Sequence, residues 1–134
     1  MNAKWLDHYL GGWSRHCDGQ DASASAMVEG ASPGIVYGDI NLADAFEGHE
    51  GVRQMCALAS GLLPGALMVV KERIVADDAW VVRWELQGRA AEQDRTYAIH
   101  GTSWGSLDAD GKVLSQTDYW NPGHYEVQVG KPLF

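Results

Sequence analysis

The chain has only two cysteines, ten basic residues against eighteen acidic ones, and no long apolar run. Cys17 and Cys56 are too few for the disulfide framework that stabilises small secreted domains. Phosphate contacts need clustered cations, so a net charge of −8 with scattered Lys and Arg argues against nucleic-acid binding. There is neither a stretch of about eighteen apolar residues nor a basic-then-apolar leader. We therefore expect a soluble, cytoplasmic protein with no membrane partner.

Motifs of several other site classes are missing as well. No glycine-rich phosphate loop and no Gly-x-Ser-x-Gly elbow occur. The five histidines lack metal-ligand spacing, and His16, Cys17 and Asp18 would face different ways on a helix. We expect neither a metal site nor a cofactor.

What the chain has is 46% apolar residues and six tryptophans within 134 residues, which fits one globular domain over residues 1–134. Residues 1–63 are predicted to be mainly helical, residues 64–122 to form an antiparallel sheet, and residues 123–134 to be a tail. Apolar spacing and end signals predict three helices and one early strand. These are Lys4–Asp18, Asp21–Met27 and His49–Leu63 for the helices, with a loop at Gly30–Gly34 before the strand Ile35–Tyr37.

The second half carries four strand patterns separated by turn residues. Helices followed by an antiparallel meander indicate an α+β fold with helices on one face of the sheet. For the tail, the alternation of Tyr125, Val127 and Val129 leaves open a further strand or a cover over a neighbouring subunit. The predicted strands are Leu67–Ala76, Trp80–Gly88, Arg95–Trp104 and Val113–Trp120.

The hairpin formed by the last two strands contains two titratable groups, His100 and Asp118. A three-residue loop ending in a Gly111 bulge would put Thr102 opposite Asp118, with His100 on the same face. A two-residue turn would put His100 and Asp118 on opposite faces. The sequence leaves both registers open.

Three short strings, in this order, resemble the nuclear-transport-factor-2-like superfamily. They are Tyr37-Gly38-Asp39, the FEGHEGVR run from Phe46 to Arg53, and Asp118-Tyr119-Trp120. Within the superfamily the chain looks most like the SnoaL-like, polyketide-cyclase-like enzymes, with limonene-epoxide hydrolase and ketosteroid isomerase as cousins. The resemblance implies a cone in which a strongly curved, mainly antiparallel sheet wraps the N-terminal helices around an apolar pocket.

The resemblance also implies roles for individual residues. Asp118 matches an aspartate that serves as acid or base in several members. Tyr37 and Asp39 are similar to a pair that orients water in the epoxide hydrolase, with Asp in place of Asn. Arg83 and Glu85 are similar to its Arg-x-Asp, with Glu in place of Asp. The isomerase has an oxyanion-donating tyrosine on its first helix, a region that here holds Tyr9 and Trp13.

Residue chemistry offers a functional and an ordinary structural role for each candidate. Asp118 shares a strand face with Trp120, where desolvation would raise its pKa, or it is a solvated strand-end aspartate. His100 is a proton shuttle or a hydrogen-bonded strand histidine. Asp39 is a second carboxylate or a turn cap. Arg83 and Glu85 form part of a site or a solvated ion pair.

The aromatic residues are candidates for the wall of a pocket that stacks flat or cyclic substrates, although aromatic residues more often build core. Tyr9 and four tryptophans make up this set. The tryptophans are Trp13, Trp84, Trp104 and Trp120.

These observations lead to one main hypothesis and two rivals. The main one is a cofactor-independent acid/base enzyme (lyase, dehydratase, isomerase or cyclase) for a hydrophobic cyclic or aromatic small molecule. Its catalytic groups would be Asp118, His100, Asp39 and Tyr37. The rivals are an epoxide hydrolase that uses Asp118 beside Arg83 and Glu85, and a non-catalytic binding or assembly module. We also expect a homodimer formed through the sheet, because both faces of the strands carry large apolar residues.

Overall fold

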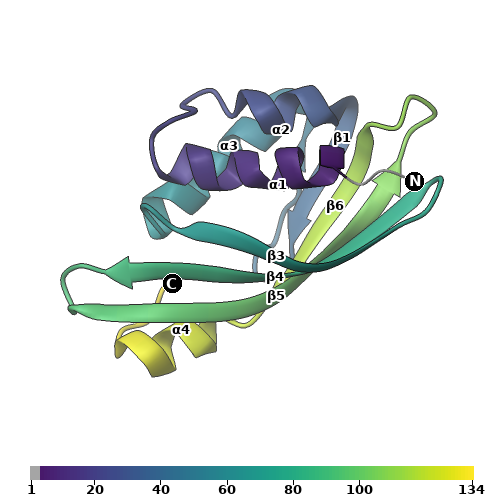
Figure 1. Ribbon diagram of the computed structural model, residues 1–134. Helices are drawn as coiled ribbons and strands as arrows, with labels where there is room; N and C mark the ends of the chain where they lie inside the picture. Colours follow the sequence, from purple (N-terminus) through teal and green to yellow (C-terminus); the bar gives the residue numbers. More distant parts are fainter. Residues whose placement is uncertain (1–3) are drawn as a thin grey trace.

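A computed structural model describes residues 4–134 as one curved sheet with a layer of three helices on one side and a short C-terminal helix on the other (Figure 1). The sheet has six strands in the order β2-β1-β6-β5-β4-β3 and does not close on itself. Three helices cover its concave face, and the core lies between the two layers. The predicted α+β cone is confirmed.

The helices and strands lie within a few residues of the positions predicted from the sequence, except in two segments discussed below. In the described part of the chain, no helix is both long and apolar enough to span a bilayer. The helices are α1 (Lys4–Cys17), α2 (Ser25–Gly30), α3 (Gly48–Leu62) and α4 (Pro122–Val129). The strands are β1 (Ala31–Asp39), β2 (Phe46–Glu47), β3 (Leu67–Val75), β4 (Ala79–Ala90), β5 (Arg95–Leu107) and β6 (Val113–Trp120).

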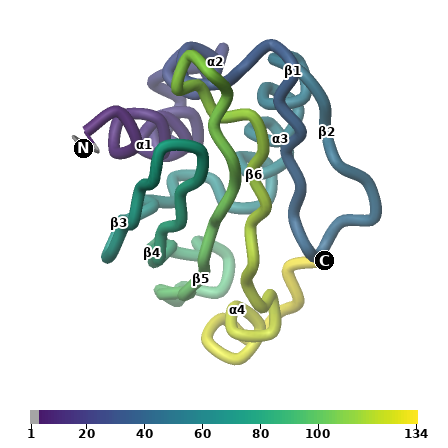
Figure 2. The backbone as a smooth tube through the Cα atoms, turned by 90° about the vertical axis from the view of Figure 1, so that its right-hand side faces the viewer, coloured from purple at the N-terminus to yellow at the C-terminus, as the bar shows by residue number. Residues whose placement is uncertain are grey.

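Strand β6 occupies the middle of the sheet, beside one parallel and one antiparallel neighbour. It pairs with β1 in parallel and with β5 antiparallel, and all other pairs in the sheet are antiparallel. Figure 2 shows β1, β6, β5, β4 and β3 side by side, with α1, α2 and α3 above them. Residues far apart in sequence, from β1 and β6, therefore share one patch of the concave face.

Helix α1 binds the sheet through one apolar stripe. Leu6, Tyr9, Leu10 and Trp13 are buried at helical spacing. The following helix, α2, begins after Ala24, and the Asp21 carboxylate accepts hydrogen bonds from the backbone N–H groups of Ser25 and Ala26 in its first turn. Local hydrogen bonds thus fix where α2 begins, and burial of apolar side chains holds α1 against the sheet.

Two segments differ from the sequence prediction. Residues predicted as a loop belong to β1, which includes Pro33. Pro33 is tolerated because the β1–β6 register shifts between Ala31 and Val36, so no ladder bond is required there. The tail forms helix α4 and not a strand. Asn121 caps it by accepting from the Gly123 N–H, and Gly130 ends it in the left-handed conformation.

Helix α4 closes the part of the β5 edge that β6 leaves uncovered. The Gln128 side chain bonds both the N–H and the C=O of Ala98, at 2.7 and 2.9 Å, as a neighbouring strand would. Tyr125 meets Tyr97 edge-on, with ring centroids 5.1 Å apart. The tail therefore covers its own sheet edge, a role the alternating pattern did not reveal.

The β5–β6 hairpin settles the register that the sequence left open. Its loop is of the three-residue kind, with Asp108 bonded to Lys112 and Gly111 at positive φ. A bulge between Ser106 and Leu107 and their partners then shifts the pairing by one residue, so Ser103 lies opposite Asp118. This single shift puts His100 and Asp118 on opposite faces of the sheet.

The convex face of the sheet carries a row of apolar side chains, in which half-buried Val81 lies between two exposed residues. Trp104 is 52% exposed and Ile74 is 71% exposed, and both are cross-strand neighbours of Val81. Tyr119 lies on the same face. A large apolar row in the middle of a sheet is typical of a protein contact surface.

We propose that a second copy of the chain covers this convex face. We expect light scattering at micromolar concentration to give twice the 14.6 kDa chain mass. Trp104→Glu should then give a monomer, because it puts a charge into the desolvated contact. Val127→Glu, which changes an exposed apolar residue of α4, should remain a dimer. A monomeric wild-type protein would contradict the proposal.

Gly101 on the concave face makes room for the Trp84 indole. A Cβ at this position would lie 2.1 Å from the Trp84 ring. Gly101→Ala should therefore displace the indole and lower the free energy of unfolding by about 1–3 kcal/mol, the usual cost of overpacking. Gly61→Ala is the matched control, because no atom lies within 4 Å of its added Cβ and alanine favours a helix. Equal denaturant midpoints for both variants would show that the Trp84 contact is not tight.

Candidate functional site

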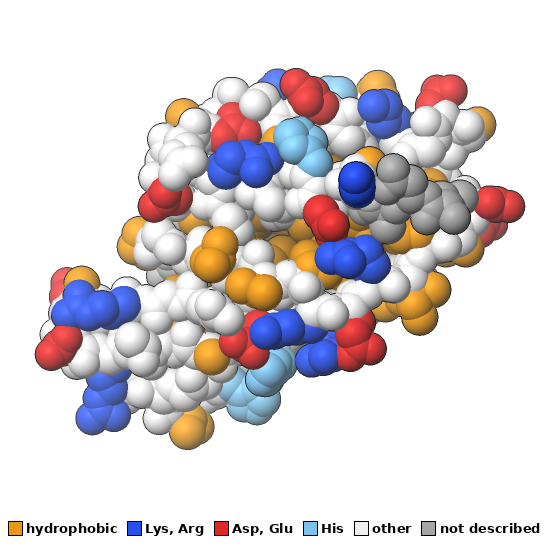
Figure 3. All heavy atoms as spheres, in the orientation of Figure 1, with side chains coloured by type: hydrophobic (Ala, Val, Ile, Leu, Met, Phe, Trp, Pro, Cys, Tyr) orange, Lys and Arg blue, Asp and Glu red, His pale blue; other side chains and the backbone are white. Residues whose placement is uncertain are grey.

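An apolar pocket opens between α1, α3 and the concave face of the sheet. The centres of water-sized molecules can occupy about 50 Å³ of it, and all the space between its walls, open solvent at the mouth included, is about 530 Å³. Figure 3 shows hydrophobic side chains gathered in the furrow between the helical layer and the sheet. The lining is mostly aliphatic and aromatic, with Asp118, Asp39 and the Tyr37 hydroxyl as its polar groups.

Asp118 is held by three hydrogen-bond donors. Its Oδ2 accepts from the Tyr37 hydroxyl at 2.8 Å. Its Oδ1 accepts from the Ser103 hydroxyl at 2.5 Å and from Gln116 Nε2 at 2.9 Å. The donors come from β1, β5 and β6, so the register of three strands fixes the carboxyl group.

A second layer of buried contacts orients these donors. The Trp84 indole N–H donates to Ser103 Oγ at 2.8 Å, which leaves the Ser103 proton for Asp118. The Tyr9 hydroxyl donates to Gln116 Oε1 at 2.7 Å, so the Gln116 NH₂ must face Asp118. A buried network of this kind holds one arrangement because every member is satisfied.

Burial changes the proton affinity of this carboxyl group. Asp118 is only 7% exposed, and desolvation raises its pKa from 3.8 to about 6. The three donors oppose the rise, and the nearby Asp39 carboxylate adds to it. Burial likewise raises the Tyr37 pKa well above 10, so this phenol stays protonated as a donor. The sequence prediction of a raised Asp118 pKa agrees with this environment.

Asp39 lies beside Asp118 on the neighbouring strand and holds a pocket wall in place. The two residues are direct partners in the β1–β6 register. Asp39 Oδ2 accepts from the Trp120 indole N–H at 2.6 Å, and its Oδ1 accepts from the Asn41 backbone and side chain. Asp39 thus combines both roles considered from sequence, a turn cap and a carboxylate in the pocket.

Four sequence candidates do not reach the pocket, because the alternation of β4 and β5 points them to the convex face. His100 is 62% exposed and lies 3.6 Å from Glu85. Arg83 is half exposed and pairs with Glu72 at 2.6 Å. Trp104 is exposed in the row described above. The predictions of His100 as a catalytic group and of Arg83, Glu85 and Trp104 as binding residues were therefore wrong.

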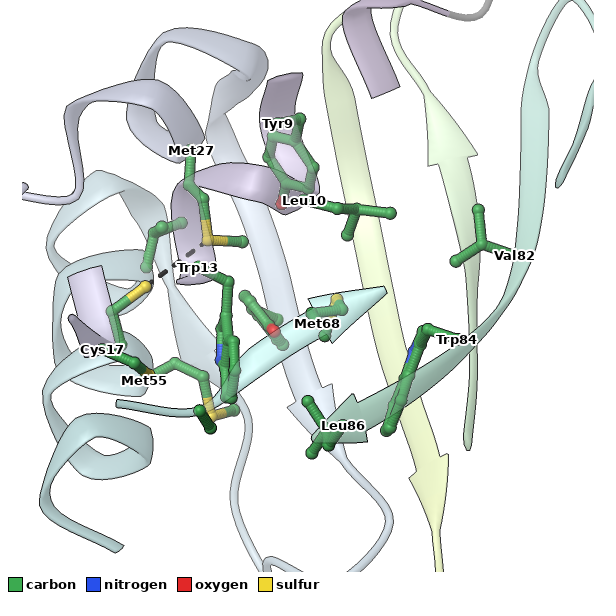
Figure 4. Packing of buried hydrophobic residues seen from close by; sticks show 14 of the residues in the cluster. Tyr9, Leu10, Trp13, Cys17, Met27, Met55, Met68, Val82, Trp84 and Leu86 are labelled. Carbon is green, nitrogen blue, oxygen red and sulfur yellow. Dashed lines mark hydrogen bonds between the residues drawn. The ribbon is translucent and has the colours of Figure 1, made fainter. Parts of the chain in front are cut away.

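The remaining candidates lie at or next to the pocket. Trp13, Trp84 and Trp120 line it as predicted. Tyr9 does not line it and acts through Gln116, so its predicted substrate contact is replaced by a positioning role. Figure 4 shows Trp13 from α1 and Trp84 from β4 on either side of Met68 and Leu86.

Ser103 and Gln116 are the site residues that sequence reasoning missed. A signal for Gln116 was present, since it lies two residues before Asp118 and so faces the same way. None existed for Ser103, because only the bulge brings it opposite Asp118. Among residues 4–134, no three His, Cys, Asp or Glu side chains gather as metal ligands would.

A curved, unclosed sheet of six strands packed with helices is consistent with the cone fold of nuclear-transport-factor-2-like proteins. The model of the SnoaL-like domain family matches residues 10–116. The chain therefore belongs to the SnoaL-like family, as the resemblance of its motifs implied. Among curated proteins, none matches the sequence significantly.

Solved structures share the fold at low sequence identity. A protein with a ketosteroid isomerase-like fold from Catenulispora acidiphila, in complex with trimethylamine, has a TM-score of 0.80 at 14% identity, covering 99% of this chain and 97% of its own. TerC, co-crystallised with polyporic acid, has a TM-score of 0.72 at 16% identity, covering 95% of this chain and 98% of its own. A protein from Jannaschia sp. CCS1, named as a SnoaL-like polyketide cyclase, has a TM-score of 0.70 at 18% identity, covering 94% of each chain.

The raised Asp118 pKa gives a pH dependence with a definite sign. The native state holds this proton more tightly than the unfolded chain does, so the carboxyl group stabilises fully below pH 3.8 and loses that contribution as pH rises through about 6. The total is about 3 kcal/mol, of which about 2 kcal/mol is lost between pH 4.5 and 7.5.

Asp118→Asn removes this titration. Its free energy of unfolding relative to wild type should therefore rise by about 2 kcal/mol between pH 4.5 and 7.5, whatever constant offset the amide introduces. Urea unfolding of both proteins at the two pH values measures this difference. The same comparison with Asp110→Asn, an exposed turn residue, should show little change. A pH-independent difference for Asp118→Asn would show that the carboxyl group is not desolvated.

Proposed function

We propose that this protein is a cofactor-independent enzyme that uses general acid/base chemistry on a hydrophobic cyclic or aromatic small molecule. The observation that carries the proposal is the Asp118 carboxyl group, buried in the floor of an apolar pocket with its pKa raised to about 6. A group that titrates near neutral pH can both take and return a proton during turnover. The reaction class would be isomerisation, elimination or ring closure.

The hydrogen bonds of Asp118 favour one oxygen as the reactive atom. Oδ1 already accepts from Ser103 and Gln116, whereas Oδ2 accepts only from Tyr37. A substrate C–H next to a carbonyl would give its proton to Oδ2, and the C–H electron pair would form the enolate. The Tyr37 hydroxyl, released from the newly protonated Oδ2, would donate to the enolate oxygen. Return of the proton to another carbon completes an isomerisation.

The names of the structural neighbours support this class of function. They include a SnoaL-like polyketide cyclase, an isomerase of the SnoaL-like family from Agrobacterium tumefaciens and AclR, named a hydroxylase. Two neighbours were crystallised with small molecules, trimethylamine and polyporic acid. These similarities support a small-molecule ligand without naming the one that this chain takes.

The geometry argues against one of the two rival hypotheses and leaves the other to experiment. Epoxide hydrolysis by Asp118 beside Arg83 and Glu85 required all three on one face, and Arg83 points to solvent. That form of the rival is not proposed again. A binding module would have Asp118 paired only for structure, so proton transfer to a bound carbon acid decides between enzyme and module.

The test is deuterium exchange into 2-tetralone, a flat bicyclic ketone with acidic C–H bonds, followed by NMR in D₂O. The wild-type protein should exchange the α-protons faster than buffer does. Asp118→Asn should lose about 10²- to 10⁴-fold of this rate, because its amide cannot accept the proton. Tyr37→Phe should lose about 10- to 10³-fold, because one oxyanion donor is removed.

Glu85→Gln is the matched control, because it removes a carboxylate from the opposite face of the same sheet. Its exchange rate should equal that of wild type. Melting temperatures measured on the same preparations separate loss of chemistry from loss of fold. An unchanged rate in a well-folded Asp118→Asn protein would refute the catalytic role and leave the binding module.

A further inference from the structure

The pocket has negative groups and no positive ones. Asp118 and Asp39 lie side by side on neighbouring strands, and both line the cavity. None of the described residues that line it is Lys, Arg or His. Two carboxylates in an apolar pocket disfavour a ligand with a carboxylate or phosphate, because like charges repel strongly where water is scarce.

Two arginines of the sheet, one on each face, are already engaged in ion pairs elsewhere. Arg83 pairs with Glu72 on the convex face. Arg73 pairs with Asp7, linking β3 to α1 at 2.6 Å. Neither lines the pocket. The charge of Asp118 is therefore balanced inside the protein by hydrogen-bond donors alone, and that of Asp39 by the Trp120 indole and Asn41.

The same pocket is walled by aromatic rings. Trp13 and Trp84 project into it from opposite layers, as Figure 4 shows, and Trp120 and Phe134 form its other side with ring centroids 6.2 Å apart. Ring faces attract cations, and Trp does so most strongly. Asp39 orients one of these faces, since it accepts the Trp120 indole N–H.

We propose that the ligand of this pocket carries an amine cation next to its hydrophobic ring, held between the Trp120 and Trp84 faces and the Asp118 and Asp39 carboxylates. This names the substrate class of the proposed enzyme, and it rests on that function only in using the same pocket. An ammonium group can interact with both kinds of lining group. The carboxylates supply negative charge, and the aromatic rings supply a desolvated surface that attracts cations.

Binding should depend on pH through Asp118. The titratable groups that face it are Tyr37 and Asp39 from β1, Tyr9 from α1 and Cys56 from α3, none of which becomes cationic. A cation favours the ionised carboxylate and releases its proton on binding. Affinity for a permanent cation should therefore rise as pH increases through about 6.

The experiment uses benzyltrimethylammonium, whose charge does not titrate, and benzyl alcohol as the neutral ring probe. Calorimetric titration at pH 7.5 should show the cation binding at least about tenfold more tightly than the alcohol, and phenylacetate binding more weakly than either. From pH 7.5 to 5 the cation should lose about tenfold in affinity, while the alcohol should not change.

Variants assign the effect to the pocket. Asp118→Asn should lose at least about tenfold for the cation and abolish its pH dependence, with benzyl alcohol unaffected. Glu85→Gln, on the convex face, should bind both probes as wild type does. Quenching of tryptophan fluorescence gives a second measurement, because three tryptophans line the site.

Equal binding of cation and alcohol, equal affinity of wild type and Asp118→Asn for the cation, or no cation binding would each overturn the inference. The 2-tetralone exchange is independent of these results, because that probe has no amine. Exchange without cation selectivity would leave the enzyme proposal standing and remove the amine. Cation selectivity without exchange would indicate a binding protein for amines.

Discussion

The structure depends on keeping one carboxyl group, Asp118, out of water. An unpaired carboxylate in an apolar pocket would be too costly to keep, so three donors surround it. Each donor is held by its own strand, and two of them are oriented by Trp84 and Tyr9. The parallel β1–β6 pair, the bulged β5–β6 hairpin and the docking of α1 must all be in place at once. The contacts that hold the fold together are therefore the same contacts that position Asp118.

The hydrogen bonds do not fully compensate Asp118 for the loss of water, and its pKa stays raised. Hydrogen bonds lower the pKa of Asp118, yet desolvation outweighs them and leaves the value near 6. A fully solvated aspartate would release its proton far below neutral pH, and a fully unpaired one would hold it far above. The intermediate balance suits a group that exchanges protons with a substrate. It also leaves negative charge in a chamber of aromatic rings, where an amine would complete the balance.

The two faces of the sheet carry different polar residues: those of the pocket on the concave face, and those of surface ion pairs on the convex face. Strand alternation sends Asp118, Ser103 and Trp84 inward, and His100, Glu85 and Arg83 outward. The convex face has ion pairs and exposed Trp104, which suits contact with another protein surface. Because the period along a strand is two, one bulge decides whether His100 and Asp118 share a face of the sheet. Without the bulge they would lie on the same face.

The sequence by itself determined the fold class, most element positions and half of the site. Helical spacing of apolar residues such as Tyr9 and Trp13, strand alternation and the order of three motifs are local or compositional signals, and Asp118, Asp39, Tyr37 and Trp120 followed from them. Only the tertiary structure decided that Ser103 faces Asp118, that His100 and Arg83 face outward and that residues 122–129 form a helix on the β5 edge. Register, bulges and edge covering arise from contacts between distant segments, and their energies depend on partners that no local pattern identifies.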